Sequence, residues 1–365
     1  MTTLNYGLIG CGMMGREHLR NVALLGDARV AAIFEPDDAM AAEASAIAPE
    51  AERVGSLEGM LARDDLDALV IVSPNHVHAE QLTAIAQARA ARPLPILCEK
   101  PIVIDEAQWA ALNAVREGYG APIWVAMEYR YMPPVAALLR GAEAATGGID
   151  MLTIREHRFP FLVKVGHWNR LNRRTGGTLV EKCCHFFDLM RLALRAEPVR
   201  VMASAGQVNN HRDEDLGGER ADVWDSAYVI VDFDTGARAM LELCMYAEGS
   251  RYQEEISAVG RAGKIECLVP GPTRFWPDDL GEPPTPQVIV SPREPKGPRV
   301  VDVPVDPELL EAGDHNGSTF YQHRRFRDVV RGTGTVEVTL EDGWRAVRMG
   351  LAAQESARTG EAVRL

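Results

Sequence analysis

Short runs of apolar residues alternate with amphipathic helical patterns along the first 125 or so residues of the chain. The apolar runs predict strands at Leu4–Ile9, Val30–Phe34, Ala68–Val72, Ile96–Cys98 and Ile123–Met127. The stretches between them predict helices over Arg16–Leu25, Asp37–Ala48, His78–Arg89 and Glu106–Arg116, with Asp37 or Asp38 capping the second. Because strands that alternate with helices pair in parallel through right-handed crossovers, this region predicts a doubly wound α/β sheet. The apolar runs are continuous, as in a sheet that helices cover on both faces.

The pattern changes after about residue 130, where extended runs follow one another with few helical stretches between them. Strands are predicted at Met151–Phe159, Val199–Val208, Ala227–Phe233, Ala239–Tyr246, Glu255–Val259 and Lys264–Val269. Turns at Asp234–Gly236 and Gly260–Gly263 predict two antiparallel hairpins. Helices are predicted at Gly177–Leu194 and Leu340–Thr359. We therefore expect two domains: residues 1–126 with the doubly wound sheet, and residues 127–365 as an α+β domain with an open, mostly antiparallel sheet.

The segment from Pro270 to Pro307 holds 11 of the 22 prolines of the chain. Proline cannot donate to a strand ladder and it breaks helix interiors, so this density argues against a central strand or a helix. We interpret the segment as an extended excursion on the surface. A proline-rich ligand for a partner protein is an alternative, but no P-x-x-P array with basic flanks stands out.

Composition and charge narrow the classes of protein to which the chain can belong. Its 39 basic and 52 acidic residues give a net charge of −13. This balance argues against a nucleic-acid duplex or an anionic membrane as the main partner, because both favour a basic surface. No apolar run approaches the ~18 residues of a membrane helix, and no signal-peptide pattern opens the chain. The six cysteines form no C-x-x-C pair, so we expect free thiols, no metal site and a cytoplasmic location.

The strongest motif is Gly10-Cys11-Gly12-Met13-Met14-Gly15, which follows the first predicted strand and opens the first predicted helix. In this context Gly10 makes a tight turn, Gly12 lets backbone N–H groups approach a pyrophosphate, and Gly15 lets helix and strand pack closely. The positive end of the helix dipole then favours the bound anion. A glycine-rich turn without a ligand is the alternative. The motif predicts that residues 1–126 form a dinucleotide-binding Rossmann domain.

Glu35 ends the second predicted strand, 20 residues after Gly15. An acidic residue at this place binds the ribose hydroxyls of the adenosine. Its carboxylate, together with Asp37 and Asp38, would repel a 2′-phosphate, and no arginine follows directly to neutralise one. The sequence therefore favours NAD over NADP, unless Glu35 serves only as a helix-capping acid in a surface loop.

Two further segments leave the carboxyl ends of predicted strands, where open α/β sheets bind ligands. Ser73-Pro74-Asn75-His76-Val77-His78 follows the third strand, and Glu99-Lys100-Pro101 follows the fourth. The H-x-H spacing lacks a third ligand nearby, so we expect no metal, and incidental histidines in a helix-start loop are an equal alternative. Pro101 restricts the backbone of Lys100 to an extended conformation, which would direct its ammonium across the cleft. A lysine after a buried strand more often only reaches out to solvent.

The last candidate constellation runs from Gly176 to Asp188 in a predicted helix. Glu181 and His185 are four positions apart and Asp188 lies three further on, which places the three on one face of a helix. In the functional interpretation His185 is a general acid or base, and Glu181 orients it or binds substrate hydroxyls. The alternative is a solvated face with an acid–histidine pair of small energy. Spacing alone does not decide between these two interpretations.

Taken together, these motifs resemble the Gfo/Idh/MocA family, which includes glucose–fructose oxidoreductase and inositol dehydrogenase, and the resemblance runs from Leu4 to Leu365. The shared motifs are, in order, the glycine loop, Ser73-Pro74-Asn75 with His78, Glu99-Lys100-Pro101, Tyr129-Arg130-Tyr131 before Pro133, the helix with His185 and Asp188, and the closing stretch from Leu340 to Gly360. Glu-Lys-Pro combined with the helix histidine is more specific than the glycine loop, because the combination fixes both sides of one cleft.

The resemblance implies roles for residues on both sides of that cleft. Lys100 would hydrogen-bond the reacting hydroxyl and His185 would take or give its proton, while Glu181 stands where the family commonly has aspartate and Cys183 where it has glycine. The implied cofactor-binding residues are Gly10, Gly12, Met13, Met14, Gly15, Glu35, Ser73, Pro74, Asn75, His78, Glu99, Lys100 and Glu128. The implied substrate-binding residues are Lys100, Arg158, His167, Trp168, Glu181 and His185. Trp168 would offer an apolar face to a sugar ring, unless it is a plain core tryptophan.

The resemblance therefore implies an NAD-dependent dehydrogenase that oxidises a secondary alcohol of a sugar, glycoside or cyclitol to a ketone. No metal is required, because a lysine supplies the electrophilic help. One alternative is a reductase of the same fold that acts on a different carbonyl or an imine; another is a catalytically inactive, cofactor-binding regulator. Intact Lys100 and His185 argue against the regulator. We also expect a homodimer or homotetramer, because the open sheet needs a cover for its second face or edge.

Overall fold

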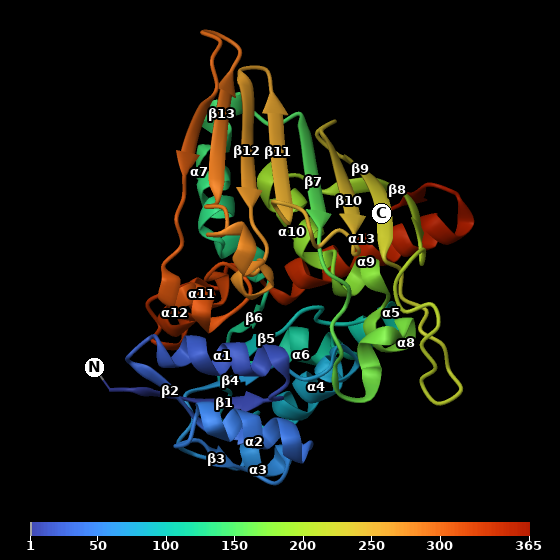
Figure 1. The fold of residues 1–365 in the computed structure, drawn as a ribbon. Helices are drawn as coiled ribbons and strands as arrows, with labels where there is room; N and C mark the ends of the chain where they lie inside the picture. The colour runs from blue at the N-terminus through green and yellow to red at the C-terminus, as the bar shows by residue number, and fades with distance from the viewer. Residues whose placement is uncertain (1) are drawn as a thin grey trace.

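The computed structural model describes residues 2–365 and contains two sheets, one above the other in Figure 1. The lower sheet has six parallel strands in the order β3-β2-β1-β4-β5-β6. Their bounds are β1 (Leu4–Ile9), β2 (Ala28–Phe34), β3 (Glu52–Arg53), β4 (Ala68–Ile71), β5 (Ile96–Cys98) and β6 (Ile123–Val125). The order runs outward in both directions from β1, so the predicted doubly wound sheet is confirmed. The sequence did not predict β3, because its two residues are polar and exposed.

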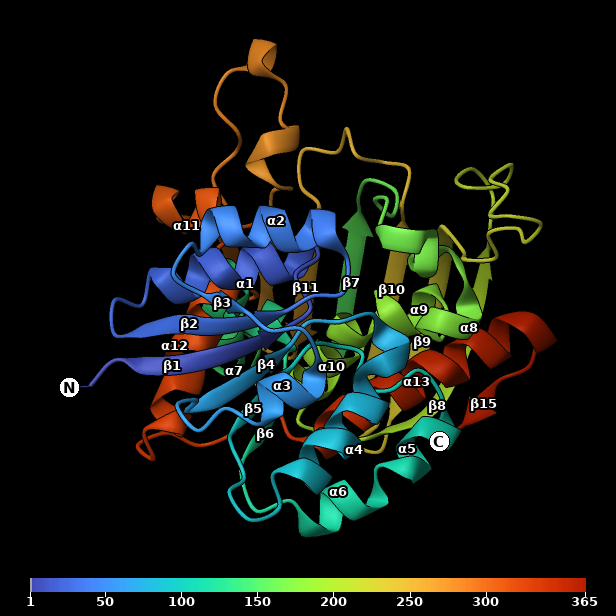
Figure 2. The same cartoon turned by 90° about the horizontal axis from the view of Figure 1, so that it is seen from below.

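Helices cover both faces of this sheet, with α1 and α2 on one side and α4 and α6 on the other (Figure 2). Their bounds are α1 (Met13–Ala23), α2 (Asp38–Ile47), α3 (Leu57–Leu61), α4 (His78–Ala88), α5 (Glu106–Ala111) and α6 (Asn113–Gly118). Asp37 caps α2 as expected, since its side chain accepts a hydrogen bond from the backbone of Met40 at 3.0 Å. The helix predicted over 106–116 is instead two short helices, which meet at Leu112.

The upper sheet has nine strands in the order β14-β13-β12-β11-β7-β10-β9-β8-β15. Their bounds are β7 (Met151–His157), β8 (Pro198–Gly206), β9 (Ser226–Phe233), β10 (Arg238–Cys244), β11 (Glu254–Gly260), β12 (Gly263–Val269), β13 (Gln287–Pro292), β14 (Arg299–Asp302) and β15 (Val363–Arg364). Both predicted hairpins, β9–β10 and β11–β12, are present. One central pair, β7–β10, is parallel and the other pairs are antiparallel. The expectation of an open, mostly antiparallel sheet is therefore confirmed.

The proline-rich segment differs from the prediction. It contains β13, which has a neighbouring strand on each side, and the edge strand β14. The segment also contains the 3-10 turns η4 (Thr273–Phe275) and η5 (Asp278–Leu280), and the short helix α11 (Pro307–Ala312) begins at its last residue. Prolines precede and end β13, which leaves its ladder donors intact, and Pro307 stands at the start of a helix, where its missing N–H has no cost. Only the part before β13 is an excursion, and it protrudes beside α1 and α2 (Figure 2).

One face of the upper sheet is covered by helices. α7 (Pro133–Thr146) packs on β12 and β13, α13 (Leu340–Thr359) packs on β8, and α10 (Cys184–Leu194) packs on α13. α13 matches its predicted bounds, and it begins with a capping box between Thr339 and Asp342. The sequence did not predict α7 or α12 (Ser318–Val330). α12 is rich in polar residues and buries only one side, against α1 and the 3-10 turn η2 (Glu128–Tyr131).

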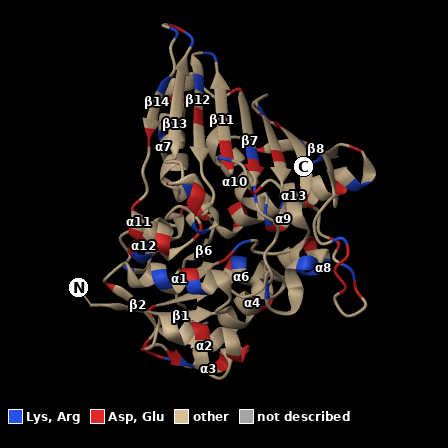
Figure 3. Cartoon of the chain, in the orientation of Figure 1, with Lys and Arg blue, Asp and Glu red and all other residues tan. Residues whose placement is uncertain are grey.

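The other face of the upper sheet is open. Side chains alternate along its strands between buried and partly exposed, and Met151, Tyr228 and Ile230 are 56%, 58% and 42% exposed. Acidic and basic residues are interspersed among these apolar groups (Figure 3), and ion pairs such as Arg155–Glu255 and His157–Glu242 join adjacent strands. The exposed apolar groups are a reason to expect self-association.

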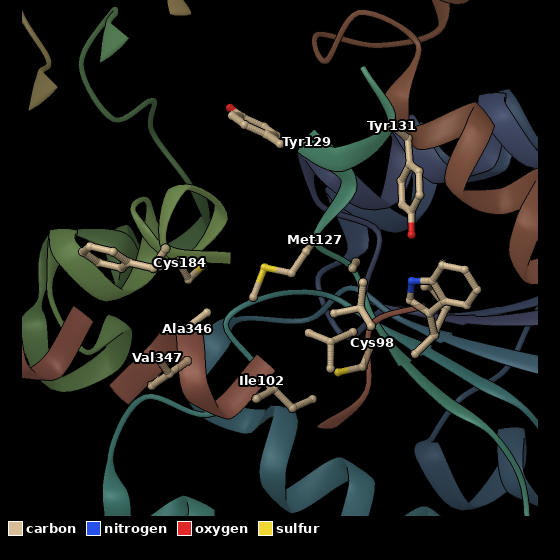
Figure 4. Close-up of a cluster of buried hydrophobic side chains, with 14 of the residues drawn as sticks. Cys98, Ile102, Met127, Tyr129, Tyr131, Cys184, Ala346 and Val347 are labelled. Carbon is tan, nitrogen blue, oxygen red and sulfur yellow. The ribbon is translucent and has the colours of Figure 1, made fainter. Parts of the chain in front are cut away.

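A continuous apolar core joins the two sheets. Figure 4 shows Ala346 and Val347 of α13 near Ile102, with Met127 and Cys184 in the same cluster. α13 approaches β6 closely at Gly343, where a Cβ atom would lie 3.0 Å from Val125 Cγ2. This packing holds the carboxyl edge of the lower sheet against the helices of the upper domain, and the candidate site lies between the two.

Candidate active site

The glycine loop between β1 and α1 has the geometry that close approach to a ligand requires. Gly10 has a φ of +94°, and a Cβ there would lie 2.7 Å from the carbonyl carbon of Val72. A Cβ on Gly15 would lie 2.4 Å from the Gly10 carbonyl oxygen, so helix and strand touch at that point. A Cβ on Gly12 would meet no described atom within 4 Å, so the backbone there is open to the space in front of the loop. Close packing thus requires glycine at positions 10 and 15, and Gly12 leaves the loop backbone open.

A cavity of about 1620 Å³ lies in front of this loop, between the two domains. It extends from the end of β2, past the glycine loop, to α9 (Thr178–Glu181). The predicted site residues that line it are Gly10, Gly12, Met13, Met14, Glu35, Ser73, Pro74, Asn75, Glu99, Lys100, Glu128, His167, Trp168 and Glu181. The predicted site residues outside its lining are Gly15, His78, Arg158 and His185. One cavity therefore contains both the dinucleotide motif and most of the candidate catalytic residues.

The residues at the glycine-loop end fit a dinucleotide. The first turn of α1 carries no acidic residue, and no side chain caps it, so its N–H groups are available to an anion. Glu35 is held at the cavity wall, because its carboxylate accepts hydrogen bonds from the backbone of Cys11 at 2.7 Å and of Asp37 at 2.9 Å. Asn75 Nδ2 is buried and finds no hydrogen-bond partner in the described part of the chain. A cofactor with phosphates, hydroxyls and an amide would satisfy these groups.

Lys100 lies in the middle of the cavity, between the end at the glycine loop and the end at α9. Its Nζ donates a hydrogen bond to the backbone oxygen of Glu181 at 3.1 Å. Burial alone would lower the pKa of Lys100, but Cys184 and the carboxylates of Glu128, Glu99 and Glu181 raise it above its usual value. The side chain is thus a permanent cation at neutral pH, and it can donate to an oxygen of a bound molecule.

The helix that carries Glu181 and His185 is not continuous, which corrects the prediction for Gly177–Leu194. α9 ends at Glu181, and α10 begins at Cys184. At the interruption the backbone N–H of Cys183 bonds to Thr178, five residues back, and the carbonyl of Glu181 accepts the hydrogen bond from Lys100. Glu181, His185 and Asp188 therefore do not form one polar stripe. Asp188 is fully buried in a two-bond ion pair with Arg130.

His185 lies directly behind the cavity wall. Its side chain is 2% exposed, and its Nε2 lies 3.6 Å from Oε1 of Glu128. Its ring stacks on that of Tyr129, with the centroids 4.1 Å apart. Burial lowers the pKa of His185 well below its usual value, and Lys100 and Lys182 lower it further. The imidazole is therefore neutral at neutral pH, and Lys100 is close enough for its charge to act on it.

A second lysine stands at the far end of the cavity. Lys164 Nζ lies 3.4 Å from Oε1 of Glu181 and 4.3 Å from the centre of the Trp168 ring. The other carboxylate oxygen of Glu181 is buried and has no hydrogen-bond partner among residues 2–365. Because the ammonium covers one face of the indole, Trp168 supports Lys164 there rather than offering that face to a sugar ring. Lys164 was not predicted from the sequence, where its only signal was a cation just before His167 and Trp168.

Comparisons with known proteins decide the family. The model of the oxidoreductase family's NAD-binding Rossmann fold matches residues 4–127, and that of its C-terminal alpha/beta domain matches residues 145–365. The chain belongs to the Gfo/Idh/MocA family. It is thus an oxidoreductase with an NAD-binding domain, as the motifs predicted.

Relatives of this Gfo/Idh/MocA oxidoreductase match it along most of their length. Inositol 2-dehydrogenase of Rhizobium meliloti (strain 1021) is 31% identical over 264 residues, which are 72% of this chain and 75% of the relative. Two solved structures have the same fold: levoglucosan dehydrogenase in complex with NADH (TM-score 0.80, 22% identity) and a myo-inositol dehydrogenase from Corynebacterium glutamicum ATCC 13032 (TM-score 0.74, 23% identity). Each alignment covers 100% of this chain and 99% of the other.

Two residues that were predicted to bind cofactor or substrate, His78 and Arg158, do not line the cavity. Both ring nitrogens of His78 bond to backbone oxygens, of Pro101 and Ser73, each at 2.9 Å. The imidazole thus ties together the two loops that line the cavity. Arg158 lies over the ring of Phe159 and 3.7 Å from the carboxylate of Glu156, behind the cavity wall. Its guanidinium is engaged by the protein and does not reach the cavity.

An ion pair between the domains completes the cavity wall, and no sequence motif predicted it. His315 Nδ1 lies 2.9 Å from Oε1 of Glu17 on α1, and Thr319 donates to the same oxygen at 2.7 Å. Burial alone would lower the pKa of His315, but Glu17 raises it to about 9. Burial alone would raise the pKa of Glu17, but His315 and Thr319 lower it to about 2. The excursion before β13 adds Thr273, Arg274, Glu282 and Pro283 to the same wall.

Among residues 2–365, no group of three or more His, Cys, Asp or Glu side chains is arranged to hold a metal ion. None of the helices in this range combines the length and the apolar character needed to cross a membrane.

Proposed function

We propose that the protein is an NAD-dependent dehydrogenase that oxidises a secondary alcohol of a sugar, glycoside or cyclitol to a ketone. Residues 1–126 would bind the dinucleotide and residues 127–365 would supply the substrate side. The observation that carries the proposal is that one cavity is lined by the glycine loop, Lys100 and Glu181 together. The relatives named as inositol 2-dehydrogenases support the substrate class.

Lys100 has the properties of the group that binds the reacting oxygen. It is a cation at the middle of the cavity, with one hydrogen bond to the Glu181 carbonyl that holds it in place. An ammonium has further N–H donors, so it can also donate to a substrate hydroxyl. As the hydroxyl loses its proton, the positive charge stabilises the negative charge that develops on oxygen. NAD, when bound, accepts the hydride from the carbon.

Glu181 and Lys164 have the properties of a polyol-binding pair. The free oxygen of Glu181 accepts a hydrogen bond from one hydroxyl, and Lys164 donates to another. His167 lies on the same wall. His185 lies behind Glu128 and completes the proposed acid–base centre together with Lys100.

A panel of polyols, sugars and glycosides tests the function directly. The purified enzyme and NAD are incubated with each compound, and NADH is followed by absorbance. We expect turnover of at least one cyclic polyol or glycoside, with NAD used in preference to NADP. If no compound produces NADH and none of the corresponding ketones is reduced by NADH, the proposed substrate class is wrong.

A further inference from the structure

The proposed base, His185, has no direct opening to the cavity. Tyr129 covers one side of its ring, and Nε2 points to Glu128 at 3.6 Å. Glu128 does line the cavity, although its side chain is only 2% exposed. Its second oxygen, Oε2, is buried without a hydrogen-bond partner among residues 2–365. A carboxylate thus stands between the imidazole and the space where the substrate would bind.

Charged groups act on Glu128 from several elements. Glu99 and Lys100 follow β5, His185 lies on α10, and His315 precedes α12. Burial and the neighbouring Glu99 raise the pKa of Glu128 to about 7, although His315 and Lys100 act in the opposite direction. A carboxyl group in this state exchanges a proton readily near neutral pH.

The other polar groups of the cavity are less suited to carry a proton. Lys100 remains an ammonium, whose N–H groups only donate. Glu181 is in an ion pair with Lys164, an arrangement that suits hydroxyl binding. Glu99 accepts a hydrogen bond from His18 at 3.0 Å, and its pKa is lowered by that contact despite burial. Among these residues, Glu128 alone links the cavity to His185.

We propose that Glu128 is the acid–base group that takes the substrate proton in the cavity, and that the imidazole of His185 behind it positions its carboxylate. This inference rests on the proposed function. In the oxidative direction the hydroxyl O–H bond breaks, and its proton goes to a carboxylate oxygen of Glu128. The C–H bond breaks as its electron pair and hydrogen leave as hydride to NAD⁺, and the C=O double bond forms. Glu128 holds this proton until it exchanges with solvent after the product leaves, and in ketone reduction Glu128 gives a proton back to the oxygen.

Kinetics of three variants test this role. Glu128→Gln keeps the shape and polarity of the side chain but cannot carry a proton, so kcat should fall about 100-fold or more. The limb of the kcat pH profile near neutrality should disappear as well. Glu128→Asp should recover part of the activity together with the pH limb. Glu143→Gln, which removes an exposed carboxylate on α7, is the matched control and should behave like the wild type.

Measuring NADH binding distinguishes an acid–base role of Glu128 from a role in cofactor binding alone. If Glu128 only contacts the cofactor, Glu128→Gln should weaken NADH binding, measured by fluorescence titration, and leave the pH profile of kcat unchanged. That result would overturn the proposal. We expect the opposite: an NADH Kd within about 3-fold of wild type and a lost pH limb.

An NMR titration without substrate tests the inference about Glu128 independently of the proposed function. In the histidine-labelled protein, the His185 ring nitrogens should show an NMR shift with a midpoint near pH 7, caused by titration of Glu128, and Glu128→Gln should abolish it. The signal is assigned by its loss in His185→Asn. If no polyol is oxidised but this inflection is present, the proposed function fails, while Glu128 still titrates beside His185 as the inference requires. If turnover is normal in Glu128→Gln or the inflection is absent, the acid–base role of Glu128 is refuted.

Discussion

Lys100 donates a hydrogen bond to the backbone oxygen of Glu181, 3.1 Å away, although the two residues are 81 positions apart in the sequence. The bond exists because the helix is interrupted between α9 and α10, so the Glu181 carbonyl faces the carboxyl end of β5. It joins the dinucleotide domain to the second domain at the middle of the cavity. The relative position of cofactor and substrate therefore depends on this contact.

Replacing Lys100 by methionine tests the electrostatic part of the mechanism. Lys100→Met keeps most of the side-chain volume but removes the charge, so kcat/KM should fall by about 100- to 1000-fold. Steady-state kinetics with the best substrate of the panel measures the loss. Lys296→Met, at an exposed position in the proline-rich segment, is the control. Wild-type turnover by Lys100→Met would show that the ammonium does not stabilise the reacting oxygen.

Glu35 should control the choice between NAD and NADP. Glu35→Gln removes the negative charge while an amide oxygen can still accept a bond from the glycine loop. We expect the ratio of kcat/KM for NAD over NADP to fall about 10-fold, equivalent to about 1.4 kcal/mol. A melting curve checks that the loop is intact. An unchanged ratio would mean that Glu35 does not repel the 2′-phosphate.

Lys164 should act on substrate affinity rather than on the cofactor. Lys164→Met removes a donor that lies between Trp168 and Glu181. Because a hydrogen bond to a charged group contributes about 1.5–3 kcal/mol, kcat/KM should fall about 10- to 100-fold, mostly through KM. NADH binding should stay at the wild-type value. A selective loss of NADH affinity would instead place Lys164 on the cofactor side.

The Glu17–His315 pair should give interdomain stability that depends on pH. The pKa of Glu17 falls from 4.5 to about 2, so its contribution is present above pH 4.5 and is lost as the pH falls through about 2. The pKa of His315 rises from 6.5 to about 9, so its contribution is complete below pH 6.5 and is lost as the pH rises through about 9. Both contributions are complete between pH 4.5 and 6.5.

His315→Gln should therefore lower the free energy of unfolding by on the order of 2 kcal/mol at pH 6, and by much less above pH 9. Chemical denaturation across this pH range measures the difference. His157→Gln breaks a more exposed pair with Glu242 on the open sheet face, and it should cost less than about 1 kcal/mol. Equal losses at pH 6 and above pH 9 for His315→Gln would exclude a charged pair.

The open sheet face should be an interface between copies of the chain. Tyr228 and Ile230 are large, apolar and about half exposed on adjacent outward positions of β9. We expect a homodimer or homotetramer by light scattering, and dissociation when Tyr228 and Ile230 are both replaced by lysine. A single-chain mass for the wild type would contradict this. So would an unchanged assembly of the double variant.

Local patterns predicted most of the fold. The continuous apolar runs at β1, β2 and β4 identified the parallel sheet, and the glycine turns identified the hairpins β9–β10 and β11–β12. α12 escaped prediction because its polar composition masks the few residues that it buries. β13 escaped because the average proline content of its segment hid a proline-free core between Pro286 and Pro292.

The candidate site was predictable only in part, for a related reason. Gly10, Glu35 and Lys100 follow strands, so the strand pattern alone places them at one edge of the sheet. The partners Glu17 and His315 are 298 positions apart, and no local pattern records such a contact. Helical spacing also predicted the wrong relative position of Glu181 and His185, because such spacing assumes an unbroken helix.

A structure of the enzyme with NADH and a polyol that it oxidises would show whether cofactor and substrate meet at Lys100. We expect the nicotinamide beside Lys100, and a substrate hydroxyl within hydrogen-bond distance of both Lys100 Nζ and the Glu128 carboxylate. A polyol bound away from Lys100, or a dinucleotide outside the cavity in front of the glycine loop, would contradict it.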